Sequence, residues 1–376
     1  MTPLTDAASP RVQAGRLSTA QSLLLDLVRI GAAILVAVGH LTQPFFSVGW
    51  PDLTYLARAA VAVFFVLSGF VIRYVTSTRR TDLAGYLKDR GSRVYSVALP
   101  AMLVTLAADS ISRRVNPVFF ATWTGDWTHP FGRVVQNLVF TAQLWQNNVN
   151  PLSNSPFWSL NYEVGYYLLY GCAFYLTGLK RWAWIVLLVL ALGPEILSLA
   201  PLWLAGCVAF DLYRRWRRSG RLSVYLNWGM AASAVAAVAL FAFVREYPGA
   251  WYALWQRRLL LTWASLWITP LDYLFGLLGT VFFLKLLEIA GRVHIAPNRR
   301  GVAAVRFISE GTFPLYLLHF PLLVLIAAWI PYNHANGLEK TLVFAAIFAV
   351  GVLAGHPCNA LKRWMRNVRW GRWGSG

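Results

Sequence analysis

A series of long apolar segments separated by basic clusters is the feature that most constrains this 376-residue chain. A helix that crosses a bilayer needs about 20 apolar residues, because its backbone polar groups must be satisfied within the helix. Only 13% of the residues are charged, against about 25% in soluble domains. We therefore predict an all-α integral membrane protein with about ten transmembrane helices in one bundle, near residues 23–46, 56–75, 94–111, 157–178, 182–197, 199–213, 226–244, 267–290, 305–330 and 338–361.

The basic residues predict which loops lie in the cytoplasm. Of the 34 lysines and arginines, 23 fall in the tails and loops on one side of the predicted bundle, 7 fall on the other side, and 4 lie in or beside spans. Loops rich in lysine and arginine remain cytoplasmic. Both termini are therefore predicted to be cytoplasmic. The same distribution explains the formal charge of +19 without nucleic acid, whose binding requires a basic face or stripe.

The chain is predicted to form one membrane domain, residues 23–361, between a cytoplasmic tail at 1–22 and a basic, aromatic tail at 362–376. No internal repeat divides this domain, and the first twenty residues lack the apolar core of a removable signal peptide. The three cysteines lie in apolar runs, which predicts buried thiols without disulfides. No cysteine–histidine cluster has metal-ligand spacing, so we expect neither a metal nor a tightly bound cofactor.

Ionisable residues occur inside several of the predicted spans. Arg29 and His40 are eleven positions apart, which returns both side chains to one helix face about 16 Å apart along the axis. Glu163 and His319 are expected at a depth similar to that of His40. Such residues are costly in a bilayer, so they indicate an internal site, with His40 and Glu163 as candidates for general-base chemistry. The alternative is that each satisfies a polar neighbour in the bundle.

Arg90 and Arg93 lie at the cytoplasmic edge of the third predicted span. Side chains three positions apart share a helix face, and two arginines there could bind phosphate. The alternative is ordinary positive-inside charge. Arg73, at the inner end of the second span, has the same two interpretations.

The long outer loop between Ser112 and Pro156 is rich in aromatic and amide side chains. One interpretation is an interfacial aromatic belt. The other is a platform for a sugar, which such side chains bind by stacking and hydrogen bonding. The residues concerned are Trp123, Trp127, His129, Trp145, Asn147, Asn148, Asn150 and Asn154.

Several enzyme signatures are missing from the sequence. It has no glycine-rich phosphate loop and no nucleophile elbow of the G-x-S-x-G kind. No histidine is followed at the fifth position by aspartate, which excludes the pattern of soluble glycerolipid acyltransferases. Ser68 follows Leu67 and precedes Gly69 within a span, where a packing role or a helix kink is the simpler interpretation.

Five segments, taken in chain order, form a recognisable set. They are Arg29 with His40, Phe64 to Ile72, Arg90 with Arg93 and Tyr95, Phe157 to Glu163, and Tyr316 to Pro321. The set resembles the motifs of the acyltransferase-3 family of integral membrane acyltransferases, and the similarity covers roughly residues 20–360. The departures from the family pattern leave the arginine, the histidine and the glutamate unchanged.

The resemblance implies an O-acyltransferase of the bacterial plasma membrane. It would move an acyl group, commonly acetyl, from acyl-CoA to a hydroxyl of a cell-surface glycan, an exopolysaccharide or a lipid-linked precursor. Acetyl-CoA or another acyl-CoA is then the donor substrate. The expected site has catalytic His40, Arg29 and Glu163, acyl-CoA contacts from Arg73, Arg90, Arg93 and Tyr95, and a substrate pocket with Ser68, Trp158, Asn161, Tyr316 and His319.

Two other functions are compatible with the residues. A transporter or flippase of an anionic or glycan substrate would also need buried His, Arg and Glu, although the chain lacks the inverted repeats common in transporters. A catalytically silent regulatory member of the family is the third interpretation, which the intact Arg29, His40 and Glu163 oppose. A homo-oligomer is compatible with all three.

Overall fold

The computed structural model of the protein describes residues 17–79, 81–124, 127–246, 270–297, 299–330 and 334–368. Several predicted features lie outside the described residues: most of the N-terminal tail, the end of the C-terminal tail, two basic residues of the outer loops and the side chain of Trp123.

Every regular element in the described ranges is a helix. The long helices are α2 (Thr19–Leu41), α3 (Thr54–Thr78), α4 (Leu83–Val115), α7 (Trp158–Tyr175), α8 (Gly178–Ser198), α9 (Ala200–Arg218), α10 (Leu222–Glu246), α12 (Pro270–Ala290), α14 (Thr312–Trp329) and α15 (Gly337–Asn367). The short helices are α5 (Pro117–Thr124), α6 (Pro130–Leu138), the 3-10 helix η1 (Ser155–Phe157) and α13 (Arg300–Glu310).

Seven of these helices are long and apolar enough to cross a membrane, namely α2, α3, α4, α8, α12, α14 and α15. The predicted class of an all-helical membrane protein is therefore confirmed. The helices α7, α9 and α10 coincide with three more predicted spans but are not among the seven. In α9 the run from Arg214 to Arg218 makes the last turn polar and shortens the apolar part. The number of ten spans and the cytoplasmic termini stay predictions.

The predicted span at 305–330 is two helices, because α13 ends at Glu310 and α14 begins at Thr312. At this junction α15 passes so close that a Cβ atom on Gly311 would lie 2.4 Å from the Cα atom of Val352. Two other predicted boundaries also differ. Helix α2 begins at Thr19, where the Ser18 side chain caps it together with Gln21, and α15 continues to Asn367, so the predicted basic tail begins within a helix.

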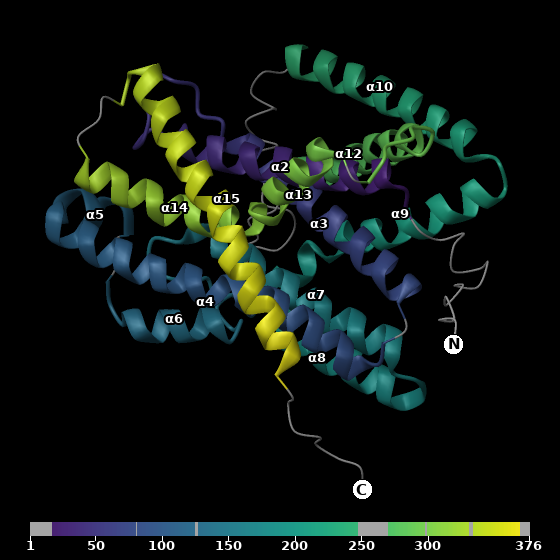
Figure 1. Cartoon of the computed structure of the whole chain (residues 1–376), viewed down its shortest axis with the longest axis horizontal. Helices are drawn as coiled ribbons and strands as arrows, with labels where there is room; N and C mark the ends of the chain where they lie inside the picture. The colour runs from purple at the N-terminus through teal and green to yellow at the C-terminus, as the bar shows by residue number, and fades with distance from the viewer. Residues whose placement is uncertain are drawn as a thin grey trace, which may run out of the picture.

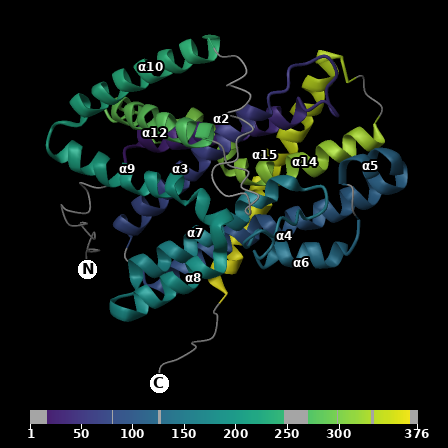
Figure 2. The same cartoon turned by 180° about the vertical axis from the view of Figure 1, so that it is seen from behind.

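Two central helices organise the bundle. Helix α3 packs against α2, α9 and α12, while α14 packs against α4, α15 and α2 (Figures 1 and 2). Helices α3 and α9 touch backbone to backbone: a Cβ atom on Gly69 would lie 1.9 Å from the Trp203 carbonyl oxygen, and one on Gly206 would lie 1.9 Å from that of Val66. Small residues permit such close crossings between membrane helices. This crossing fixes the position of Ser68 inside the bundle.

Candidate active site

A cavity of about 100 Å³ lies between α2, α3, α4, α7 and α14, and we call it the inner cavity. It follows α3 from Val61 to Ile72, eleven residues or about 16 Å along the helix axis. It contains six of the twelve predicted site residues. Its lining comprises Arg29, Val61, Phe64, Phe65, Leu67, Ser68, Val71, Ile72, Arg90, Arg93, Ser159, Leu160, Glu163, Tyr167, Thr312, Phe313 and Tyr316.

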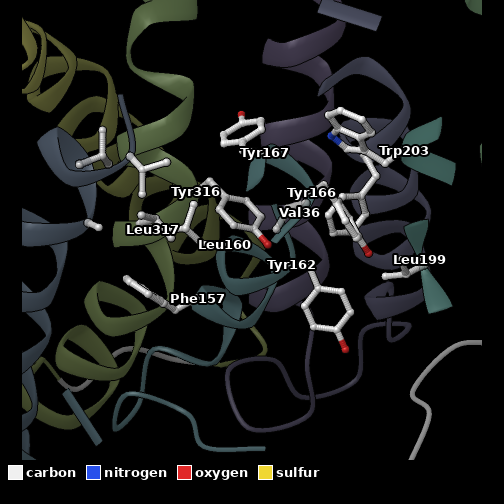
Figure 3. Packing of buried hydrophobic residues seen from close by; sticks show 14 of the residues in the cluster. Val36, Phe157, Leu160, Tyr162, Tyr166, Tyr167, Leu199, Trp203, Tyr316 and Leu317 are labelled. Atoms are coloured by element: carbon white, nitrogen blue, oxygen red, sulfur yellow. The ribbon is translucent and has the colours of Figure 1, made fainter. Parts of the chain in front are cut away.

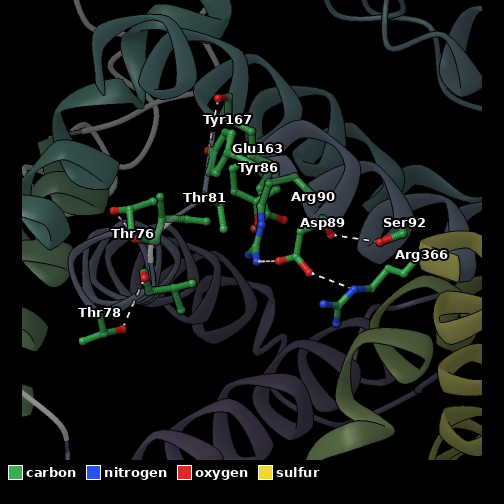
Figure 4. A network of polar contacts seen from close by, with 12 residues as sticks. Thr76, Thr78, Thr81, Tyr86, Asp89, Arg90, Ser92, Glu163, Tyr167 and Arg366 are labelled. Atoms are coloured by element: carbon green, nitrogen blue, oxygen red, sulfur yellow. Dashed lines mark hydrogen bonds and ion pairs between the residues drawn. The ribbon is translucent and has the colours of Figure 1, made fainter. Parts of the chain in front are cut away.

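Arg90 is held at the basic end of the inner cavity by a carboxylate and an aromatic ring. It forms an ion pair with Asp89, which also lies 3.4 Å from Arg366 of α15 (Figure 4). Its guanidinium carbon is 5.9 Å from the centre of the Tyr167 ring. The Arg90 side chain is only 12% exposed, so these contacts compensate the charge of a largely buried cation.

Arg29 and Arg93 connect the inner cavity to a second, more polar cavity of about 280 Å³, which we call the basic vestibule. Both residues line the two cavities, and Arg29 lies 3.6 Å from Asp26. The vestibule adds Arg306 of α13 and Lys362 of α15. The sequence interpretation missed these two cations because it counted them only as cytoplasmic loop and tail charges. The vestibule lining therefore has four cations against two carboxylates, Asp26 and Glu310, and Arg90 follows in the inner cavity.

Glu163 of α7 lies in the middle of the inner cavity. Its Oε1 atom accepts hydrogen bonds from the Ser68 hydroxyl at 2.8 Å and from the Tyr167 hydroxyl. Trp203 of α9 donates its indole N–H to the same Ser68 oxygen at 3.2 Å. Ser68 thus links a carboxylate to the α3–α9 crossing. It does more than the packing role expected of it from sequence.

Tyr316 of α14 lies at the end of the inner cavity away from the three arginines. Its hydroxyl is 2.6 Å from that of Ser159 and donates to the carbonyl oxygen of Pro156 at 3.1 Å. Its ring contacts Phe64 edge to face, with 6.0 Å between ring centres. Figure 3 shows Tyr316 and Tyr167 within one buried cluster drawn from α14 and α7. This end of the cavity is mostly apolar, with a few hydroxyl groups.

Next to Tyr316 lies a pair of histidines, neither of which lines the inner cavity: His319 is fully buried and His40 is half-buried. The ring centres of His40 and His319 are 5.2 Å apart, and that of His319 is 6.1 Å from that of Tyr316. Nδ1 of His319 lies 3.1 Å from the carbonyl oxygen of Leu315 and must carry the proton of that hydrogen bond. Among the described residues, nothing bonds Nε2 of His319. A buried imidazole with an unpaired basic nitrogen is suited to proton transfer.

The predicted pairing of His40 with Glu163 is wrong. The ring of His40 faces His319, while Glu163 lies in the inner cavity with Arg29 and bonds Ser68 and Tyr167. The two residues were expected at similar depth, but Glu163 lines the inner cavity with Arg29, and His40 lies about 16 Å from Arg29 along α2. Arg29 and His40 do both face the bundle interior, as their spacing predicted.

Two residues expected at the acyl-CoA site lie elsewhere. Arg73 forms a two-point ion pair with Asp211 of α9, through bonds of 2.9 and 3.0 Å, and does not line the inner cavity. Tyr95 points to the opposite side of α4, where its hydroxyl donates to the carbonyl oxygen of Leu138 at 3.0 Å and its ring packs on Phe140. Both interpretations are therefore corrected: these side chains hold helices together.

The two remaining predicted pocket residues, Trp158 and Asn161, lie in different places. Trp158 lines a different cavity of about 250 Å³, which we call the outer cavity. Asn161 is buried and bonds the side chain of Asn137 in α6, at 3.4 Å, so it lines neither cavity. The outer cavity is lined by Arg58, Val61, Ala62, Phe65, Gln143, Asn148, Asn150, Ser155, Trp158, Tyr162, Leu199 and Asp272.

Comparison with known proteins identifies the family of the chain. A family model described as an acyltransferase domain matches residues 23–356. No curated protein matches the chain significantly, and no solved structure does. Because the match covers nearly the whole chain, including both histidines and the complete lining of the inner cavity, the protein belongs to the acyltransferase-3 family of membrane acyltransferases.

Proposed function

We propose that the protein is an acyl-CoA-dependent O-acyltransferase of the bacterial plasma membrane. It transfers an acyl group, acetyl in the simplest case, to a hydroxyl of a cell-surface or exopolysaccharide glycan or of its lipid-linked precursor. One observation carries the proposal: a basic vestibule leads through arginines into a narrow cavity lined at its other end by Tyr316, whose ring contacts His319, which in turn contacts His40. That order of groups matches an anionic carrier with a reactive end.

The donor would bind with its phosphates at the basic end. Arg90, Arg93 and the vestibule residues Arg306 and Lys362 supply the cations, and arginine suits phosphate because its planar fork donates two parallel hydrogen bonds. The acyl-bearing arm would then extend along α3 toward Tyr316. Apolar side chains such as Phe64 enclose this part of the cavity and exclude water from the thioester.

The chemistry would take place beside the histidine pair. His40 removes the proton of the acceptor hydroxyl as its oxygen attacks the thioester carbonyl carbon. The carbon–sulfur bond breaks, the ester forms, and the proton passes to the departing CoA thiolate. His319, whose Nδ1 is bonded to a carbonyl, would hold the His40 ring and exchange the proton with it. Glu163 would instead shape the cavity through Ser68 and Tyr167.

Surface-glycan acylation in cells tests the proposal. Proton NMR of the surface polysaccharide from a deletion strain should lack O-acetyl signals that the parent strain shows, and the wild-type gene should restore them. Purified protein should also release CoA from acetyl-CoA. A transporter of the same glycan would leave acetyl-CoA intact, so this assay separates the two functions. Replacing Arg114, which is exposed and lines none of the three cavities, with Ala provides a control that should behave as wild type.

A further inference from the structure

The outer cavity has the chemistry of a carbohydrate site. We propose that it binds a neutral sugar unit of the acceptor, which it holds with three side-chain amides and one indole ring. The amides belong to Gln143, Asn148 and Asn150, and the indole belongs to Trp158. This inference rests on the proposed function, because it identifies the substrate that receives the acyl group and the residues that select it.

The outer cavity adjoins the inner cavity through a shared wall. Val61 and Phe65 of α3 line both cavities, so a single layer of side chains separates them. On α7, Tyr162 lines the outer cavity and Tyr167 the inner one. In Figure 3 the Tyr162 hydroxyl points away from the rings of Tyr167 and Tyr316. A sugar in the outer cavity would therefore be separated from the donor cavity by the side chains of Val61 and Phe65.

The polar lining of the outer cavity is made of neutral groups that both donate and accept hydrogen bonds. Gln143 is 2% exposed, and its Nε2 donates to Oδ1 of Asn148 at 3.3 Å. That bond orients both amides and leaves one oxygen and one NH₂ group for a ligand. Asn150 and the hydroxyl of Ser155 complete the set. Sugar hydroxyls, which donate and accept equally, match such a lining.

An aromatic side chain forms another part of the outer cavity lining. Trp158 packs edge to face on Tyr162, with 5.0 Å between ring centres and 83° between planes. It lies 6.3 Å from the ring of Phe65. These contacts fix the indole while leaving it part of the cavity lining. A rigid ring face beside polar groups binds the C–H face of a pyranose without a large loss of side-chain entropy.

The charges of the outer cavity cancel. Arg58 and Asp272 are the charged residues of its described lining, and they form an ion pair of 2.7 Å with each other. The inner cavity, by contrast, has three arginines and one glutamate. An anionic ligand would gain little from the outer cavity and has a better site in the vestibule. The lining therefore favours a neutral sugar over an acidic one.

The amide-bearing loop is fixed in one conformation. Trp145 has a left-handed backbone, with φ of 55°, and donates from its backbone and indole nitrogens to the carbonyl oxygens of Leu192 and Leu190. Asn154 donates to the carbonyl oxygen of Leu317 on α14 at 2.8 Å. Strained backbone of this kind persists only when its surroundings hold it. The loop is thus organised before a ligand arrives, as a selective site requires.

The test separates acceptor binding from donor turnover. Purified wild-type protein is given acetyl-CoA with methyl glucoside, methyl galactoside or methyl mannoside as neutral probes. In Asn148→Ala/Asn150→Ala, the acceptor KM should rise about tenfold or more, since each lost hydrogen bond contributes about 1 kcal/mol. Acetyl-CoA hydrolysis without acceptor should remain within about twofold of wild type, because the donor cavity is untouched. Trp158→Leu should also raise the acceptor KM while leaving acetyl-CoA hydrolysis unchanged. Trp158→Tyr should retain most of the acceptor affinity, because it keeps an aromatic ring.

Asn147→Ala is the matched control, because Asn147 lies in the same loop but bonds Thr141 and does not line the cavity. It should leave the acceptor KM unchanged. An unchanged KM in Asn148→Ala/Asn150→Ala, with hydrolysis intact, overturns the inference and leaves the proposed function standing. Absence of acetyl-CoA turnover in wild type overturns the proposed function itself. Methyl glucuronide that competes as well as the neutral glycosides also overturns the inference.

A lipid-linked and a free glycan share this chemistry, and a second arm distinguishes them. Glucose linked to a polyprenyl phosphate is compared with methyl glucoside under the same conditions. A lower KM for the linked sugar, lost to the same degree in Asn148→Ala/Asn150→Ala, indicates a lipid-linked acceptor that uses this cavity. Equal KM values indicate a free glycan. If the KM for the linked sugar is the same in wild type and in Asn148→Ala/Asn150→Ala, the inference is contradicted.

Discussion

The imidazole rings of His40 and His319 lie 5.2 Å apart, centre to centre, where α2 meets α14. The two helices come from opposite ends of the chain, so the pair exists only in the folded bundle. The Leu315 carbonyl oxygen fixes the proton of His319 on Nδ1 and leaves Nε2 as a base. Under the proposed function, this pair would hold and pass one proton beside Tyr316, which lines the inner cavity.

Replacing the second histidine tests this pairing. His319→Gln should lower kcat for acyl transfer about 10- to 100-fold, in the lower part of the range for acid–base groups, while the KM for acetyl-CoA changes little. A residue that only fills space would alter stability without this division between kcat and KM. Steady-state kinetics of the purified variant, with its unfolding temperature measured in parallel, provides the comparison. A kcat equal to that of wild type contradicts the proton role.

The donor route makes a prediction about charge. Arg93→Gln/Lys362→Gln should weaken acetyl-CoA binding at least about tenfold, because charge-assisted hydrogen bonds contribute about 1.5–3 kcal/mol each. Binding to wild type should also fall more steeply with added salt than binding to the variant. Arg73→Gln is the control and should bind within about twofold of wild type, since Arg73 pairs with Asp211. Isothermal titration in detergent measures all three.

Glu163 is predicted to stabilise the bundle through its two hydroxyl donors. Glu163→Ala leaves the Ser68 and Tyr167 hydroxyls without their acceptor, which costs about 1–3 kcal/mol of stability. Glu163→Gln keeps an acceptor oxygen and should lose less stability than Glu163→Ala. Thermal unfolding followed by intrinsic fluorescence ranks the three proteins. An unfolding temperature in Glu163→Ala equal to that of wild type would rule these contacts out as stabilising.

The α3–α9 crossing predicts an unusual sensitivity to a single methyl group. Gly206→Ala places a Cβ atom 1.9 Å from the Val66 carbonyl oxygen, so the two helices must separate. We expect a loss of about 1–3 kcal/mol or more, typical of overpacking. Gly31→Ala, in a position with no neighbour within 4 Å, is the matched control and should be tolerated. Equal yields of folded protein from both variants, judged by size-exclusion chromatography, would contradict the close backbone contact between α3 and α9.

The apolar segments predicted the class of fold because hydrophobic length is a local property of the chain. The turn at Gly311 was missed although Gly311 and Pro314 are both helix-breaking residues, because the apolar run continues across them and was taken as one span. The inward face of Arg29 and His40 was predictable from helical periodicity. The residues that Arg29 and His40 contact could not be predicted, because periodicity identifies one face of one helix and not the helix that packs against that face.

The misplaced residues illustrate the same limit. Arg73 finds its carboxylate 138 positions away, a distance that no local pattern reaches. Tyr95 could have been excluded once Arg93 was assigned to the cavity. Side chains two positions apart on a helix point about 200° apart around its axis, so Arg93 and Tyr95 cannot face the same cavity. Lys362 and Arg306 were counted only among the cytoplasmic charges, and their common position became clear only when α13 and α15 were seen to line the basic vestibule.

Acetyl-CoA turnover by purified His40→Ala is the most direct test of the account. The variant is compared with wild type in the presence of a glycan acceptor, with acetyl-CoA binding measured on the same samples. The account predicts that acyl transfer falls at least about 100-fold, the usual minimum for a general base, while acetyl-CoA still binds. Transfer at the wild-type rate by folded His40→Ala would contradict it.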